Sequence, residues 1–319
     1  MTAALFPTAR TIEEASERIR SIARRTPVLT SQSFDAHANC EVHFKCENFQ
    51  KGGSFKIRGA SNLILSIPKA GLEKGIVAYS SGNHAQAVAI AARHVGAPAT
   101  IVMPADAPRS KLEATAAQGA RIVTYDRLRE SREEIAARIL EESGATLVPP
   151  FDHPCIMAGQ GTTAREFLEQ APGIEALITP VGGGGLLSGC AVAARAGKPS
   201  IRILGAEPEL SNDTFLSLQA GRHVEVDPSR TIADGLRAPT PGKLTFPVIQ
   251  SHVERILLVS EDEIRATVKF LLTRMKILVE PSGAVAAAAV FFRKLPEEIR
   301  SVGVVLSGGN VDFDQLVRY

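Results

Sequence analysis

The chain has 319 residues, of which 45% are hydrophobic and 22% charged, and its formal net charge is +2. This composition excludes intrinsic disorder, and the balanced charge gives no electrostatic footprint for nucleic acid. No apolar run reaches the ~20 residues that span a bilayer, and the N-terminus has no secretory pattern, so we expect a cytoplasmic protein without a membrane partner. The four cysteines lack CxxC spacing, which favours neither a disulfide framework nor a zinc site.

Short aliphatic runs alternate with longer helical patterns along the chain, which predicts an α/β fold with parallel sheets. The runs predict buried strands at 42–45, 76–80, 100–103, 121–124, 176–181, 201–205, 256–259 and 302–306. The longer patterns predict helices at 11–25, 85–94, 131–142, 261–275 and 282–294. The irregular, proline-rich stretch 223–247 predicts a long functional loop.

The strand and helix patterns between residues 75 and 146 repeat as a compact β-α-β-α-β-α unit. Both flanking parts carry similar patterns, which indicates a second α/β layer built from the two ends of the chain. We therefore predict a small, mobile, substrate-closing domain at 75–146, inserted in a discontinuous cofactor-binding domain of residues 1–74 and 147–319.

The segment 45–60, KCENFQKGGSFKIRGA, places a lysine directly after a glycine loop. Gly52 and Gly53 make the loop flexible, and Ser54 is expected to cap a helix that begins near Lys56. The positive field at a helix N-terminus lowers the pKa of an amine, which favours the neutral nucleophile that a Schiff base requires. A solvated surface lysine is the more common alternative.

Polar turns follow two of the predicted strands. The segment 80–86, SSGNHAQ, opens an alanine-rich helix whose free N–H groups suit a carboxylate or phosphate, and Asn83 adds an amide. Ordinary N-capping explains this segment equally well. The segment 302–310, VGVVLSGGN, places Ser307 at the carboxyl end of a strand, where ligands of open α/β sheets collect, although Ser-Gly-Gly-Asn is also an ordinary turn.

Four consecutive glycines, Gly182 to Gly185, join a predicted strand to a helix that is expected to begin at Leu186. Glycines in this position let the backbone wrap an anion, with N–H groups and the helix dipole facing it. The spacing differs from the dinucleotide fingerprint and from the P-loop. The run therefore predicts a phosphate cup, with a flexible linker as the alternative.

Glu207 and Asp213 follow another predicted strand. Two carboxylates with carbonyl oxygens between them suit a hard cation such as Mg²⁺ or Ca²⁺, although a solvated acidic loop is the more common explanation of this spacing.

The lysine, the glycine cup and the helix start in segment 80–86 together predict pyridoxal phosphate as the cofactor. The lysine would form a Schiff base with its aldehyde, the glycine cup would bind its phosphate, and the helix start would bind the carboxylate of the substrate.

The chain resembles the serine/threonine dehydratase and serine racemase family of fold-type II pyridoxal-phosphate enzymes over nearly its whole length. The motifs that carry the resemblance are the KGSFK-like segment, SSGNHAQ, AGQGT at 158–162, GGGG, DG and SGGN, in the order and spacing of the family. The resemblance implies a tryptophan-synthase-β-like α/β fold with two open, twisted, mostly parallel sheets and helices on both faces. It also implies a homodimer.

The resemblance further implies roles for individual residues. Lys56 would form the Schiff base, and Ser81 would act as a second acid/base on the opposite face of the cofactor. The cofactor would be bound by Phe55, Asn83, Gly182, Gly183, Gly184, Gly185, the Leu186 amide and Ser307. The substrate would be bound by Ser80, Ser81, Asn83, His84 and Arg132. A divalent cation (Mg²⁺, Mn²⁺ or Ca²⁺) would be bound by Glu207, Asp213 and the Ser211 carbonyl.

The expected reaction is β-elimination of a β-hydroxy amino acid, such as L-threonine or L-serine, to a 2-oxo acid and ammonia. One alternative is a threo-3-hydroxyaspartate ammonia-lyase, in which Arg132 or Arg237 binds the second carboxylate. Another is a serine racemase. A non-catalytic amino-acid sensor is the alternative outside enzymes, and the presence of both Lys56 and Ser81 argues against it. The loop after Asp234 does not match the pattern of any one substrate.

Overall fold

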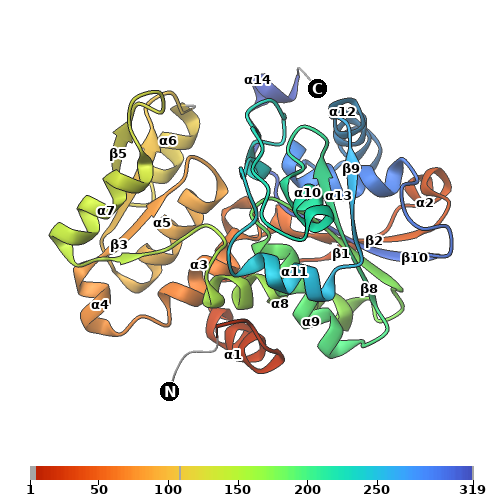
Figure 1. Ribbon diagram of the computed structural model, residues 1–319, viewed down its shortest axis with the longest axis horizontal. Helices are drawn as coiled ribbons and strands as arrows, with labels where there is room; N and C mark the ends of the chain where they lie inside the picture. Colours follow the sequence, from red (N-terminus) through yellow and green to blue (C-terminus); the bar gives the residue numbers. More distant parts are fainter. Residues whose placement is uncertain (1–4, 108, 318–319) are drawn as a thin grey trace.

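The fold contains two sheets that lie side by side, each with helices on both faces (Figure 1). The computed structural model describes residues 5–107 and 109–317. Most strand pairs in both sheets are parallel, as the alternation of strands and helices predicts. The predicted fold class is therefore confirmed.

The larger sheet has six strands, and its only antiparallel pair among the described residues is the one between its first two strands. Its order is β1 (Val28–Leu29), β2 (Glu41–Cys46), β10 (Ser301–Leu306), β7 (Ala176–Pro180), β8 (Arg202–Pro208) and β9 (Arg255–Val259). The last strand of the chain thus lies inside the sheet, between β2 and β7.

The smaller sheet has four parallel strands, all drawn from residues 76–147. Its order is β5 (Arg121–Tyr125), β4 (Ala99–Pro104), β3 (Ile76–Tyr79) and β6 (Thr146–Leu147). Ile57 and Ile156 lie outside this segment but belong to the same hydrophobic core as one face of the sheet. The division into domains at 75 and 146 stays a prediction.

Fourteen α-helices among the described residues connect and cover the strands. They are α1 (Ala9–Ile19), α2 (Gln32–Ala38), α3 (Lys56–Ile64), α4 (Lys69–Lys74), α5 (Asn83–Val95), α6 (Arg109–Ala116), α7 (Arg132–Ser143), α8 (Pro154–Gln170), α9 (Gly185–Gly197), α10 (Asp213–Ala220), α11 (Thr245–His252), α12 (Glu261–Phe270), α13 (Pro281–Phe291) and α14 (Phe313–Leu316). Short 3₁₀ turns occur at Glu47–Phe49, Lys51–Gly53 and Asp234–Leu236, and one π-turn occurs at Leu271–Met275.

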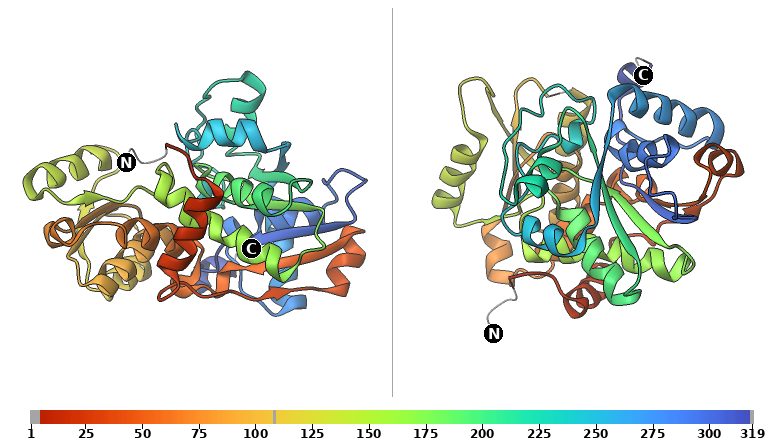
Figure 2. Two further views of the ribbon diagram at one scale, coloured as in Figure 1. Left: turned by 90° about the horizontal axis from the view of Figure 1, so that it is seen from below. Right: turned by 45° about the vertical axis from the view of Figure 1, so that its right-hand side comes forward.

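Strand β7 shows how the larger sheet is buried on both faces. Ala176 and Ile178 belong to the core that contains α13, whereas Leu177 belongs to the core that contains α8 and α9. Adjacent residues of a strand point to opposite faces, so a fully aliphatic strand requires a core on each side. Helices α1, α3 and α8 pack on one another where the two sheets meet, as the two views in Figure 2 show.

The eight predicted strands are all confirmed, but several predicted boundaries are wrong. The helix expected at 11–25 ends at Ile19, and the helix expected at 261–275 changes to a π-turn after Phe270. Helix α9 begins at Gly185, one residue before the expected start. The two-residue strands β1 and β6 are too short to give a periodic signal in the sequence.

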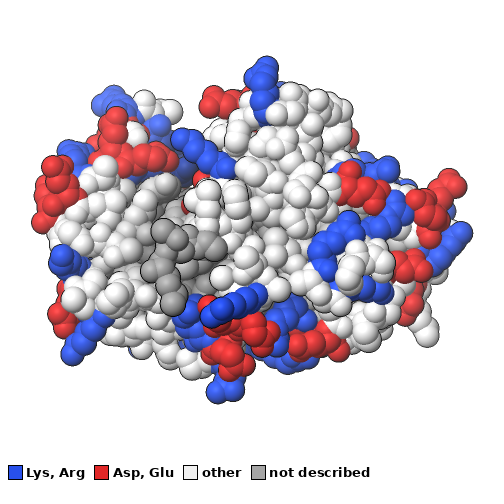
Figure 3. Space-filling model, turned by 60° about the horizontal axis from the view of Figure 1, so that its bottom comes forward, with Lys and Arg blue, Asp and Glu red and all other residues white. Residues whose placement is uncertain are grey.

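None of the helices in the described ranges is both long and apolar enough to cross a membrane. The longest apolar run of the sequence forms most of α13, in which every residue from Pro281 to Phe291 is buried. Lysine and arginine lie among aspartate and glutamate around the edges of the face in Figure 3, whereas the middle of this face is mostly uncharged. This pattern agrees with the near-neutral net charge.

Candidate active site

A cavity of about 720 Å³ lies between the two sheets. Its lining includes residues that follow the carboxyl ends of β3, β7 and β10, which is where open α/β sheets bind their ligands. The cavity brings together every residue predicted to bind cofactor or substrate: Phe55, Lys56, Ser80, Ser81, Asn83, His84, Arg132, Gly182, Gly183, Gly184, Gly185, Leu186 and Ser307.

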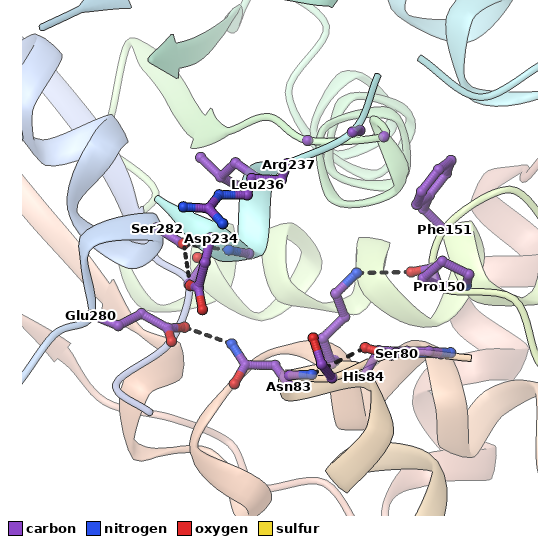
Figure 4. Close-up of a pocket in the computed structure, with 18 of the residues that line it drawn as sticks. Ser80, Asn83, His84, Pro150, Phe151, Asp234, Leu236, Arg237, Glu280 and Ser282 are labelled. Atoms are coloured by element: carbon purple, nitrogen blue, oxygen red, sulfur yellow. Dashed lines mark hydrogen bonds between the residues drawn. The ribbon is translucent and has the colours of Figure 1, made fainter. Parts of the chain in front are cut away.

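Lys56 is the first residue of α3, and its Nζ donates a hydrogen bond to Pro150 O at 2.8 Å (Figure 4). Burial lowers the pKa of this amine to about 8. The neutral, nucleophilic form is therefore accessible near neutral pH. The alternative of a solvated surface lysine is therefore wrong, and Lys56 lies in the first turn of the helix as predicted.

Ser54 does not cap α3, which corrects the prediction. Its backbone is extended and forms an isolated antiparallel bridge with Gly308. Phe55 occupies the N-cap position without a side-chain hydrogen bond, and its ring lies 5.1 Å from Lys56 Nζ. The bridge therefore connects the lysine loop directly to the turn after Ser307.

Helix α5 begins at Asn83, and its N-cap residue, Gly82, has no side-chain cap. Ordinary capping by a serine or asparagine is thus excluded as the explanation of the SSGNHAQ segment.

His84 is buried and its Nε2 lies 2.8 Å from Val148 O. Burial, and then the nearby charge of Lys56, lowers the pKa of His84 to about 3, so this imidazole is neutral at physiological pH.

The glycine run has the geometry that a phosphate cup requires. Gly184 has φ +88°, a left-handed conformation that favours glycine, and it directly precedes the first turn of α9. A Cβ at Gly183 would overlap the Phe151 ring, so the backbone of the loop approaches its neighbours too closely for a side chain. The free N–H groups at the start of a 13-residue helix suit a phosphate. These residues fit the cofactor that the sequence predicts.

Two further predicted residues lie at different depths in the cavity lining. Ser307 is 4% exposed, whereas Arg132 remains partly exposed and lies over the Tyr79 ring at 5.2 Å. Arg132 also forms an ion pair with Glu133 at 2.7 Å. Ser307 therefore belongs to the interior of the site, and Arg132 to its entrance.

Five charged residues of the lining were not predicted as site residues, and Glu280, Lys111 and Asp234 among them make contacts that link separate parts of the cavity. Glu280 is 4% exposed and accepts a hydrogen bond from Asn83 Nδ2 at 2.6 Å (Figure 4). Lys111 on α6 forms an ion pair of 2.7 Å with Asp234, which joins the small-sheet side of the cavity to the large-sheet side. The DG motif could have indicated Asp234 as a site residue. No neighbouring residues in the sequence indicate Lys111 or Glu280, because their partners are more than a hundred residues away.

The predicted metal residues lie outside the cavity lining but next to it, since Ser211 Oγ donates to the carbonyl of Leu236, which lines the cavity. Glu207 and Asp213 are both fully buried. Burial, and then the charge of Asp213, raises the pKa of Glu207 well above its usual value, and burial raises that of Asp213 to about 7. Glu207 accepts backbone hydrogen bonds from Thr214 and Phe215, whereas neither Asp213 oxygen has a partner among the described residues.

This arrangement suits a bound cation, because buried carboxylate oxygens without donors require compensation. Within the described part of the chain, no group of three or more His, Cys, Asp or Glu residues could hold a metal ion. A cation at Glu207 and Asp213 would therefore complete its coordination with backbone carbonyls and water.

Comparison with known proteins identifies the family to which the chain belongs. Residues 19–308 match the family model described as pyridoxal-phosphate dependent enzyme. The chain is 47% identical to an L-threo-3-hydroxyaspartate ammonia-lyase of a Pseudomonas species over 95% of each chain. It is 44% identical to a serine racemase of Schizosaccharomyces pombe, with coverage of 99% of this chain and 98% of the relative. The solved structure of maize serine racemase superposes with a TM-score of 0.94 at 44% identity, covering 98% of this chain and 96% of that structure.

The chain therefore belongs to the family of pyridoxal-phosphate-dependent enzymes. Its similarity extends over whole relatives with racemase and ammonia-lyase names. The predicted cofactor is confirmed at the level of the family, and the sensor alternative has no support among these relatives.

Proposed function

We propose that this enzyme catalyses β-elimination of a β-hydroxy amino acid, such as L-serine or L-threonine, to a 2-oxo acid and ammonia. The observation that carries the proposal is that Lys56, Ser81 and the glycine run line one cavity. A lysine that is readily deprotonated, a hydroxyl and an anion cup are the groups that this reaction needs in one place.

In the proposed arrangement, Lys56 holds the cofactor covalently, Gly182 to Gly185 bind its phosphate, and Ser307 lies beside its ring nitrogen. When bound, the cofactor supplies an electron sink for charge that develops at the substrate Cα. Ser307 is uncharged, so it cannot stabilise a protonated ring nitrogen as an aspartate does, which favours elimination over transamination.

The chain itself supplies the proton transfers. After the substrate amine has replaced it on the cofactor, the freed Lys56 amine would take the proton from the substrate Cα. Its pKa of about 8 would let it both accept and return a proton near neutral pH. Ser80, Asn83 and His84 orient the substrate carboxylate at the start of α5. Ser81, which also lines the cavity, would return a proton to Cα from the side opposite Lys56, which is the step that racemisation of serine needs.

We propose in addition that Glu207, Asp213 and the Ser211 carbonyl bind a divalent cation. The unpartnered Asp213 oxygens support this assignment. The cation would neutralise two buried carboxylates behind Leu236 and so stabilise the loop that lines the cavity. A homodimer is also part of the proposal and rests on the family resemblance, whereas the cytoplasmic location rests on the composition and cysteine pattern of the sequence.

A threo-3-hydroxyaspartate ammonia-lyase is the second candidate, and one observation favours it. Arg237 lines the cavity, and within the described ranges its guanidinium donates only to the carbonyl of Thr231. The other arginines of the lining and Lys111 each have a carboxylate partner within the described chain: Arg127 with Asp106, Arg132 with Glu133, Arg265 with Asp262, and Lys111 with Asp234. Arg237 is thus the cavity arginine with the most free capacity for a second substrate carboxylate.

A substrate panel tests the proposal. Purified enzyme is supplied with L-serine, D-serine, L-threonine and L-threo-3-hydroxyaspartate, with and without Mg²⁺, and 2-oxo acid, ammonia and the opposite enantiomer are measured.

Two variants test the assigned residues. Lys56→Ala should abolish turnover, and a Lys56→Ala enzyme that still releases 2-oxo acid would refute the assignment. Arg237→Gln should lower kcat/KM for the dicarboxylate and leave that for L-serine unchanged, with Arg265→Gln as the control.

A further inference from the structure

Three motifs that lie far apart in the sequence meet at Asn83 through a line of hydrogen bonds. Asn83 Nδ2 donates to Glu280 Oε1 at 2.6 Å, and Asn83 Oδ1 accepts from Asn310 Nδ2 at 2.8 Å (Figure 4 shows the Glu280 end). The same Asn310 Nδ2 donates to the carbonyl of Gly52 at 2.8 Å. The glycine loop before Lys56, the start of α5 and the turn after β10 are thereby connected.

The line of hydrogen bonds allows one orientation of each amide. A backbone carbonyl only accepts hydrogen bonds, so Gly52 requires the NH₂ group of Asn310 on its side. That NH₂ group also faces Asn83 and requires the Asn83 oxygen there. The Asn83 NH₂ group is then left for Glu280 and for the cavity. Rotating the Asn83 amide by 180° would oppose two NH₂ groups at the Asn310 end.

Two motif glycines leave the space that this line of contacts occupies. A Cβ at Gly53 would overlap the Asn310 amide, and a Cβ at Gly308 would overlap the Glu280 carboxyl group. Gly53 also has φ +73°, which disfavours other residues. The glycines on both sides are therefore needed for the contacts themselves, beyond any role in chain flexibility.

We propose that Glu280 and Asn310 are positioning residues that hold the Asn83 amide with its NH₂ group toward the cavity, so that Asn83 always presents a donor to the ring oxygen of the cofactor. We call Glu280, Asn310 and the Gly52 carbonyl the Asn83 clamp. The inference rests on the proposed function and on the cofactor-binding role that the family resemblance implies for Asn83, whose amide would bond the ring hydroxyl of the cofactor. A fixed donor stabilises the deprotonated ring oxygen, because a hydrogen bond to the charged form of a group favours that form.

Glu280 does not fix the Asn83 amide by itself, because of the protonation state of Glu280. Burial, and then the charge of Asp234, raises the pKa of Glu280 to about 8, while the Asn83 hydrogen bond and Lys111 oppose this shift. A neutral carboxyl group still accepts through its carbonyl oxygen, but it can also donate through its hydroxyl. Glu280 alone would therefore tolerate a flipped Asn83, whereas Asn310 excludes it.

The first test replaces Asn310 by aspartate, which has the same shape but no NH₂ group. The purified apoprotein is titrated with pyridoxal phosphate, and the absorbance spectrum of the bound cofactor is recorded. Asn310→Asp should raise the dissociation constant of the cofactor about tenfold, the effect of one lost hydrogen bond, and shift absorbance from the visible band to the near-ultraviolet band. Asn48→Asp is the matched control, because Asn48 donates to the Leu278 carbonyl at 3.0 Å and does not line the cavity.

The second test compares two changes at Glu280. Glu280→Gln keeps an acceptor for Asn83 and should resemble the unmodified enzyme in cofactor affinity and spectrum. Glu280→Leu removes that acceptor and should change both in the same direction as Asn310→Asp but by less, because Asn310 still excludes the flipped amide. If the leucine variant does not fold, as judged by its thermal unfolding, Asn310→Asp and Asn310→Ala decide the question. Unchanged affinity and spectrum in both Asn310 variants would overturn the clamp.

Asn83→Ala separates this failure from failure of the proposed function. If Asn83→Ala changes the affinity and spectrum while the Asn310 variants do not, the cofactor lies where we propose and only the clamp is wrong. If Asn83→Ala also changes nothing, the ring oxygen does not face Asn83, and both the placement of the cofactor and the clamp are refuted.

Discussion

Two clusters of buried charge in this protein differ in whether their charges are compensated. Around Arg58, which is completely buried, the guanidinium donates to both oxygens of Glu47 and both oxygens of Glu166 at 2.8 Å. Lys45 Nζ joins Glu166 at 2.8 Å. In contrast, Glu207 and Asp213 are buried together, and among the described residues neither forms an ion pair with a basic side chain.

The difference is that the first cluster is compensated within the described chain, whereas the second is the one that we propose binds a cation. Burial alone would raise the pKa of Glu166, but the hydrogen bonds and charges of Arg58 and Lys45 outweigh it and lower the pKa. At Asp213, burial raises the pKa to about 7. The first cluster is therefore complete within the chain, whereas the second lacks the positive charge that a cation would supply.

The largest expected effect comes from breaking the complete cluster. Arg58→Met leaves Glu47 and part of Glu166 uncompensated in the interior, and should lower the free energy of unfolding by about 3–5 kcal/mol. Unfolding by denaturant measures the change. A loss below about 1 kcal/mol would mean that water compensates these carboxylates and that the cluster is not a closed unit.

The incomplete cluster should respond to added cation. Mg²⁺, Mn²⁺ or Ca²⁺ at a hundred times its dissociation constant should stabilise the protein by about 2.7 kcal/mol, and a chelator should reverse the change. Thermal unfolding with and without each ion measures it. Asp213→Asn should remove the response, and a protein whose unfolding ignores every ion would contradict the metal assignment.

His84 offers a third case, a buried group that remains neutral instead of being paired. Its pKa is about 3 in the folded protein and ~6.5 when unfolded, so between these values the unfolded state binds more protons. Stability should therefore fall as the pH decreases below 6.5, by about 2 kcal/mol at pH 5. Unfolding measured from pH 7 to pH 5 should show a shallower decline in His84→Gln, and equal slopes would show that this imidazole is not kept neutral.

The smallest expected effect is at the surface. Arg165 pairs with Glu13 at 2.5 Å and Glu169 at 3.1 Å, but its side chain is about a third exposed. Arg165→Met should cost less than about 1 kcal/mol, because solvent screens exposed pairs. This variant is the matched control for Arg58→Met, and a loss as large as that of Arg58→Met would remove the distinction between the two clusters.

The sequence predicts the parts of this molecule that depend on local patterns. The aliphatic strands and the glycine runs are recognisable because their signals occupy a few neighbouring residues. The capping role of Ser54 was predicted wrongly because a long-range bridge to Gly308 holds that residue extended. Local propensity does not report a partner 254 residues away.

Local sequence patterns likewise do not reveal every residue of the candidate active site. Lys56 and Asn83 stand in motifs, but Glu280 precedes an ordinary Pro-Ser-Gly helix start, and nothing local indicates that it contacts Asn83. The family resemblance supplies roles for residues in motifs, whereas the pairings among them come from the fold. The fully buried Arg58, two residues after Lys56, likewise has no sequence signal that distinguishes it from an exposed arginine.

The position of β10 inside the large sheet has a consequence for biosynthesis. This strand is formed by Ser301–Leu306 but pairs with β2 and β7, and the turn after it supplies Ser307 and Asn310. A nascent chain cannot complete either the sheet or the clamp until residues 301–310 have left the ribosome. We therefore expect chains that stop before residue 301 to remain without bound cofactor.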